Sequence, residues 1–100
     1  MQSDIIGISI TDYETIENIK YVLKNYKYLI DPHTSVGFSA LKKYKKDNNC
    51  IGIVLSTAHP AKFPKIMNEL NINYEIPDQL KLIQKKNIYK KRIDNDYFLL

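Results

Sequence analysis

The feature that most constrains the fold is an apolar run at residues 50–55, CIGIVL, in which polar and apolar residues do not alternate. A strand with one face in water alternates between the two kinds of residue, whereas a strand of a parallel sheet is covered on both faces and is apolar throughout. The run therefore predicts a buried parallel strand. A β-branched run at residues 5–10 predicts a second strand or an extended lead-in.

Helix signals surround these runs. Thr11 and Glu14 match a capping box, and apolar residues then recur at helical spacing, which predicts a helix over residues 12–26. Asp31 followed by Pro32 predicts the start of a second helix, because aspartate is a favoured N-cap and proline fits the first helical position. The inner face of this second helix is predicted to consist of Val36, Gly37, Ala40, Leu41 and Tyr44.

Prolines mark the later helices. Pro60 and Pro64 bracket the predicted beginning of a third helix, and residues 76–78 open a short fourth one. The segment 86–100 has no clear pattern. The chain thus reads as helices around a short parallel-sheet element, an α/β class. At most two strands are present, and a stable sheet normally needs three or more, so we expect residues 1–100 to form one incomplete domain.

Composition narrows the function classes. The net charge is +4, but lysines supply nearly all of the 15 basic residues and Arg92 is the only arginine, which disfavours a nucleic-acid partner. Cys50 is the only cysteine, so an internal disulfide and a thiolate metal site are excluded and a reducing, cytoplasmic setting is expected. No run approaches the roughly 18 apolar residues of a membrane span.

The apolar run passes directly into the polar segment STAHPAKF at residues 56–63. Ligands of open α/β sheets bind at the carboxyl ends of strands, so Ser56 and Thr57 are candidate ligand-binding residues. Their hydroxyls both donate and accept hydrogen bonds. The alternative is a structural role, as an N-cap of the third helix or in a loop-stabilising hydrogen bond.

Three further polar residues have open roles. His59 is a possible acid–base group and Lys62 a possible Schiff-base lysine, although each is also consistent with a structural or solvent-facing position. His33 either contacts an anion at the start of its helix or is a surface residue of the first turn. The sequence contains no glycine-rich phosphate loop, no paired carboxylates and no zinc-ligand spacing.

Two segments carry a family resemblance. DPHTSVGFSALKKY at residues 31–44 and GIVLSTAHPAKF at residues 52–63 resemble the bacterial and fungal branch of threonine synthase in order and in separation. The preceding TDYETIENIKYVLKNY resembles the helix that leads into the first of these segments. The resemblance extends from about residue 7 to residue 77 and is weak in the tail.

This resemblance implies the C-terminal part of a pyridoxal-phosphate lyase of the tryptophan synthase β-like fold (fold type II). Such enzymes convert O-phospho-L-homoserine and water into L-threonine and phosphate. It also implies that the Thr57 hydroxyl faces the pyridine nitrogen of the cofactor, with Ser56 as a weaker candidate. Lys62 does not match the family's Schiff-base lysine, so no catalytic residue is expected in this chain. The expected partners are the substrate and the remainder of the enzyme chain, and the alternative is a cofactor-free interaction or regulatory domain.

Overall fold

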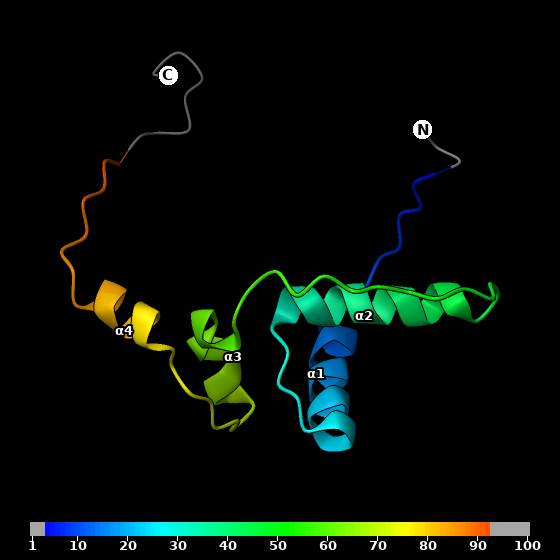
Figure 1. The fold of residues 1–100 in the computed structure, drawn as a ribbon, viewed down its shortest axis with the longest axis horizontal. Coiled ribbons are helices and arrows are strands. Elements are labelled where there is room, and N and C mark those ends of the chain that lie inside the picture. The colour runs from blue at the N-terminus through cyan, green and yellow to red at the C-terminus, as the bar shows by residue number, and fades with distance from the viewer. Residues whose placement is uncertain (1–3, 93–100) are drawn as a thin grey trace, which may run out of the picture.

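The computed structural model describes residues 4–92, and its ordered elements there are all helical. In chain order they are α1 (Asp12–Tyr26), α2 (Pro32–Lys45), the 3-10 helix η1 (Pro60–Lys62), α3 (Pro64–Glu69) and α4 (Asp78–Gln84). Figure 1 shows α1 lying crosswise under α2. After α2 the chain turns and runs back along that helix as an extended segment before it reaches α3 and α4.

The predicted α/β fold class is wrong for this chain. Residues 5–10 and 50–55 are extended, but no strand is formed anywhere in residues 4–92. Ile51, Ile53 and Leu55 are 96%, 86% and 76% exposed, so the run predicted to be buried on both faces is open on one of them. A strand exists only through ladder hydrogen bonds to a neighbouring strand. The described part of the chain supplies no such neighbour.

The helix N-termini were predicted correctly because their signals are local. The Thr11 hydroxyl accepts from the Glu14 backbone N–H, and the Glu14 carboxylate accepts from the Thr11 N–H at 2.8 Å, which completes the capping box. Asp31 caps α2 and Pro32 occupies its first turn. The third predicted helix is divided, because η1 ends before Pro64 begins α3. The predicted fourth helix is confirmed as α4, and residues 93–100 of the tail lie outside the described residues.

The contact between α1 and α2 buries polar side chains of α2, which corrects the predicted inner face of this helix. Its buried residues are Thr34, Ser35 and Ser39, whereas Val36 is 38% exposed. The buried Asn18 side chain donates to the backbone oxygen of Ser35 at 3.3 Å, and the Ser35 hydroxyl donates to the backbone oxygen of Thr15 at 2.7 Å. Small hydroxyl side chains bring the two helices close together, and these hydrogen bonds satisfy the polar groups that the contact buries.

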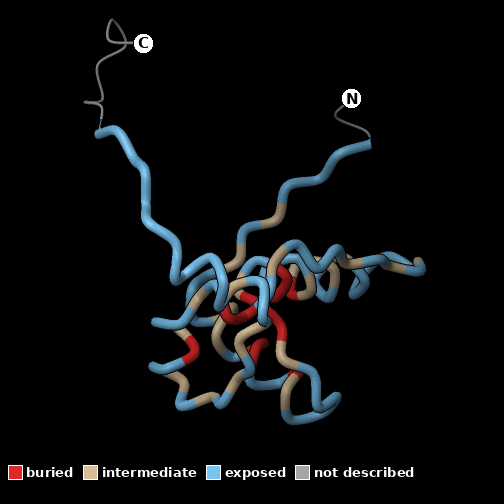
Figure 2. The backbone as a smooth tube through the Cα atoms, turned by 60° about the vertical axis from the view of Figure 1, so that its left-hand side comes forward, coloured by how far each residue is buried: buried red, intermediate tan, exposed pale blue. Residues whose placement is uncertain are grey.

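The apolar core is small. Ile19, Val22 and Ile30 form its buried centre, and the partly buried residues packed against them are Leu29, Phe38, Leu70 and Ile72. Figure 2 shows that the buried backbone is confined to the middle of the chain, with both described ends exposed. Asn71 takes a left-handed conformation (φ 52°) after α3, and the Ile72 N–H bonds the Met67 oxygen at 3.0 Å. This Schellman-type ending directs Ile72 back to the core.

The extended segment packs on α2 through its alternate residues. Gly52 lies against the side chain of Leu41, and Val54 lies against Gly37 of α2. The outer residues Ile51, Ile53 and Leu55 are therefore the ones left exposed. The small residues predicted on α2 do permit a close approach, but to this extended segment and not to a sheet.

We expect Gly52→Ala to destabilise the chain. A Cβ at this position would overlap the Leu41 side chain, so Leu41 must leave its rotamer or the segment must move away from α2. Overpacking of this kind costs about 1 kcal/mol or more. Thermal unfolding measures the effect. Gly7→Ala is the matched control because nothing lies within 4 Å of its Cβ position, and an equal loss in both variants contradicts the expected clash.

Candidate functional site

The polar segment 56–63 forms one wall of an open pocket of about 780 Å³. Ser56 and Thr57 are both exposed and both line it, together with His59 and Lys62. The opposite wall comes from two connecting segments, residues 27–29 and 73–75. The structure therefore brings together four of the residues that the sequence suggested.

The fold of the loop is set by His59 and not by the hydroxyl residues. His59 is the N-cap of η1, and its Nδ1 accepts from the Ala61 backbone N–H at 3.1 Å. The Lys62 N–H donates to the His59 oxygen at 3.0 Å, and Pro60 and Ala61 are buried. His59 thus has a structural role, since accepting this bond occupies one ring nitrogen.

The hydroxyls of Ser56 and Thr57 are free to bind a ligand. Neither makes a hydrogen bond to any residue in the range 4–92, and neither caps a helix there. Being exposed, they keep their donor and acceptor capacity at the surface of the pocket. The N-caps of η1 and α3 are His59 and Phe63, so neither hydroxyl residue caps these helices.

The pocket is also lined by a lysine and by a segment that connects two helices. The lysine is Lys62, which is exposed. Tyr74 and Glu75 were missed by sequence reasoning, because they lie on a connecting segment without a motif. The path of the chain between α3 and α4 brings them to the pocket, and no local signal in the sequence predicts that path.

His33 does not line this pocket. Its ring nitrogen Nδ1 lies 3.3 Å from a carboxylate oxygen of the buried Asp31, and its ring packs against Phe63 with centroids 5.1 Å apart. The side chain is 67% exposed, as expected for a residue of the first helical turn. The other role predicted for His33, contact with an anion at the start of the helix, stays a prediction.

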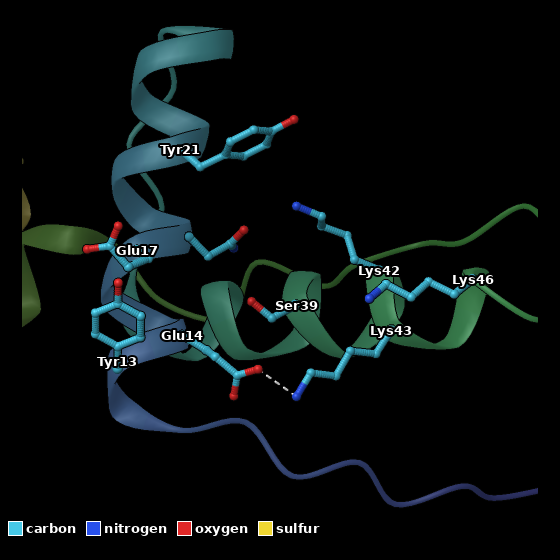
Figure 3. Close-up of a pocket in the computed structure, with 9 residues that line it drawn as sticks. Tyr13, Glu14, Glu17, Tyr21, Ser39, Lys42, Lys43 and Lys46 are labelled. Carbon is cyan, nitrogen blue, oxygen red and sulfur yellow. Dashed lines mark ion pairs between the residues drawn. The ribbon is translucent and has the colours of Figure 1, made fainter.

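A second groove, of about 400 Å³, lies between α1 and α2. Figure 3 shows Lys42, Lys43 and Lys46 extending from α2 toward α1. Lys43 pairs with Glu14 at 2.7 Å, and the Lys42 ammonium lies 4.3 Å from the centre of the Tyr21 ring. The hydrogen bond from Lys43, together with those from the Thr11 backbone and hydroxyl, lowers the pKa of Glu14 from its ordinary 4.5 to about 2.

We expect Lys43→Met to raise the pKa of Glu14 toward 4.5, since it removes the largest cause of the shift. A carboxylate whose pKa is depressed in the folded state stabilises the protein fully above its unfolded value, and this contribution is lost as the pH falls through the folded pKa. The loss therefore falls between about pH 4.5 and 2, and in the variant it should be smaller and end at a higher pH, because the folded pKa is closer to the unfolded one. An NMR titration of the Glu14 carboxyl measures it, with Lys46→Met as control. An unchanged Glu14 pKa in Lys43→Met would contradict the assignment.

Two kinds of feature are absent from the described residues. Within residues 4–92, no group of three or more His, Cys, Asp or Glu side chains is placed to hold a metal ion. In the same range, no helix is both long and apolar enough to cross a membrane.

Comparison with known proteins identifies the family. The family model described as "Threonine synthase, C-terminal" matches residues 34–98. The threonine synthase of Schizosaccharomyces pombe is 44% identical over 69 residues, which cover 65% of this chain and 13% of that protein. The threonine synthase of Haemophilus influenzae is 32% identical over 96 residues, which cover 95% of this chain and 22% of that protein.

A third relative, the threonine synthase of Eremothecium gossypii, is 31% identical over 100 aligned residues, covering 86% of this chain and 20% of its own length. The chain thus spans about a fifth or less of the curated relatives' length. No solved structure matches the chain. The matched region includes α2 from Thr34 onward, the extended segment and the loop that carries Thr57. The chain therefore belongs to the threonine synthase family and corresponds to its C-terminal region.

Proposed function

We propose that this chain is the C-terminal portion of a threonine synthase, which uses pyridoxal phosphate to convert O-phospho-L-homoserine and water into L-threonine and phosphate. In this proposal it contributes one wall of the cofactor site and no catalytic residue. The observation that carries the proposal is the pocket at residues 56–63, where the hydroxyls of Ser56 and Thr57 are exposed and make no hydrogen bond to residues 4–92.

The residues of the pocket fit part of the cofactor. Its volume of about 780 Å³ is within the range of small-molecule sites, roughly 300 to 1,000 Å³. When bound, pyridoxal phosphate supplies an electron sink for carbanions formed on the substrate. In the proposed arrangement, the Thr57 hydroxyl donates to the pyridine nitrogen, and Ser56 is the weaker candidate for a second contact. A neutral hydroxyl, unlike a carboxylate, leaves that nitrogen largely unprotonated.

The rest of the site is proposed to come from the remainder of a threonine synthase polypeptide. This chain has three glycines, which cannot build a glycine-rich phosphate loop, and Lys62 is not proposed as the Schiff-base lysine. Two observations support an incomplete domain at residues 1–100. The apolar core is small, and Ile51, Ile53 and Leu55 are largely exposed on one side of the extended segment. A large apolar surface of this kind usually marks an interface.

Fragment complementation tests the proposal. A relative's threonine synthase from which the region matching this chain has been deleted is mixed with the chain, and phosphate release from O-phospho-L-homoserine is measured with pyridoxal phosphate present. We expect no release from either part alone and measurable release from the mixture. A complex that forms without any turnover would favour the cofactor-free interaction role.

Turnover by the chain alone would overturn the proposal, since the chain is proposed to hold no catalytic residue. The cofactor spectrum gives a second check. If Lys62 formed a covalent bond to pyridoxal phosphate, the chain alone would show a visible absorption band that borohydride removes. That band would restore Lys62 as a candidate catalytic residue.

A further inference from the structure

The two segments at residues 31–44 and 52–63 meet in space through a pair of rings. His33 lies in the first turn of α2, and Phe63 lies between η1 and α3. Their ring centroids are 5.1 Å apart and the ring planes are inclined by 51°. This geometry is within the range of favourable aromatic pairs, about 4.5 to 7 Å.

The His33 ring is held from its other side by Asp31, whose side chain is fully buried. Asp31 accepts hydrogen bonds from the backbone N–H groups of His33 at 3.0 Å and Thr34 at 3.3 Å, and also from the Thr34 hydroxyl. His33 Nδ1 also lies 3.3 Å from a carboxylate oxygen of Asp31, which is within hydrogen-bonding distance. The imidazole is therefore tied to a buried anchor on one side and to Phe63 on the other.

Phe63 joins the loop to α3. Its N–H donates to the Pro60 oxygen at 2.9 Å and closes η1, and its oxygen accepts from the Met67 N–H at 3.2 Å at the start of α3. Met67 is fully buried, so the α3 side of this joint is fixed. Phe63 is the N-cap residue of α3, and its side chain makes no capping hydrogen bond. The ring contact between Phe63 and His33 therefore links the junction of η1 and α3 to α2.

We propose that His33 is a positioning residue that fixes the loop 56–63 against the N-terminus of α2. Through this loop it sets the place of Thr57 relative to α2, and this last link rests on the proposed function. The Asp31 carboxylate orients the imidazole, and the imidazole orients Phe63. His33 is 67% exposed and lines no part of the candidate cofactor pocket, so it acts on the loop through Phe63 and not on a ligand in that pocket.

Amide hydrogen exchange of the intact chain tests the proposal without any cofactor. In His33→Ala we expect the Lys62 and Phe63 amides to exchange about threefold to tenfold faster, the range set by the loss of one aromatic pair. The Lys27 amide, which bonds the Leu23 oxygen at the end of α1, should keep its rate. Phe63→Leu should give the same pattern, and the double variant should add little to either single one, because all three remove the same contact.

Conservative variants separate the ring contact from simple loss of stability. His33→Phe keeps the ring but not the contact with Asp31 and should restore part of the slow exchange in the loop, whereas His33→Gln keeps a donor for Asp31 and should restore none. Tyr26→Leu is the matched control, since it removes the Tyr21–Tyr26 ring pair, with centroids 6.2 Å apart, on α1. The proposal is overturned if His33→Ala accelerates exchange equally in α1 and in the loop. It is also overturned if the loop amides keep their rates in both His33→Ala and Phe63→Leu.

Discussion

Replacing Asp31 with alanine is expected to lower the free energy of unfolding by about 2 to 4 kcal/mol, close to the whole stability of a domain with so small a core. Asp31 is fully buried and caps α2 by accepting from the backbone N–H groups of His33 and Thr34. An N-cap aspartate contributes about 0.5 to 2 kcal/mol, and each buried donor left without a partner costs about 1 to 3 kcal/mol. The Thr34 hydroxyl would lose its acceptor as well.

Thermal or urea unfolding measures this effect, and a loss of the cooperative transition at 25 °C is within the expected range. Asp31→Asn keeps an acceptor oxygen for the cap, so it should retain part of the stability. Asp78→Ala is the control, because the Asp78 side chain is 95% exposed in the first turn of α4. Equal stability of Asp31→Ala and Asp78→Ala would show that the cap at α2 contributes nothing.

The starts of α1 and α2 were predictable from the sequence because each depends on a few neighbouring residues. Thr11, Glu14, Asp31 and Pro32 act within three or four residues of their own positions, so nothing about the rest of the fold was needed to place α1 and α2. The buried face of α2 was a different matter. Ser35 and Ser39 are polar and buried, and the hydrogen-bond partners of Ser35 are Asn18 and Thr15 of α1. Their burial depends on the crossing of two helices and not on the pattern of either one.

The extended segment failed as a strand prediction for a related reason. Apolarity without alternation says that a run can be buried on both faces, but the partner that buries it and pairs its backbone must come from elsewhere. In residues 4–92 the only cover is α2, which takes Gly52 and Val54 and leaves Ile51, Ile53 and Leu55 exposed. The sequence of this run alone does not show whether a second strand pairs with it.

Half of the candidate pocket was predictable. Ser56, Thr57, His59 and Lys62 stand together in the sequence, so a shared wall follows from their adjacency. The opposite wall, at residues 27–29 and 73–75, has no such signal, because its position depends on how α1 and α3 end. Left-handed residues at both ends, Lys27 (φ 54°) and Asn71 (φ 52°), turn the chain toward the pocket. Neither position is a glycine, so sequence reasoning had no reason to expect these turns.

In a complete threonine synthase containing this region, Thr57→Val is expected to reduce turnover about 10- to 100-fold while the fold persists. Valine keeps the shape of threonine and removes the hydroxyl that is proposed to bond the pyridine nitrogen. One neutral hydrogen bond is worth roughly 0.5 to 1.5 kcal/mol, and a buried acceptor left unpaired costs about 1 to 3 kcal/mol. Since each 1.4 kcal/mol is about a factor of ten in rate, the stated range corresponds to a loss of about 1.4 to 2.8 kcal/mol, which is the size of one unpaired buried acceptor.

The companion substitutions at this position separate the hydroxyl from the shape of the residue. Thr57→Ser should recover much of the turnover, because the donor survives, whereas Thr57→Asp should shift the reaction toward side products by favouring a protonated ring nitrogen. Steady-state phosphate release and the cofactor absorption spectrum report both effects. The fold should tolerate all three changes, since Thr57 is exposed and makes no hydrogen bond to residues 4–92. If Thr57→Val left turnover and the spectrum untouched, the hydroxyl could not be the group that faces the cofactor, and Thr57 would be an ordinary loop residue.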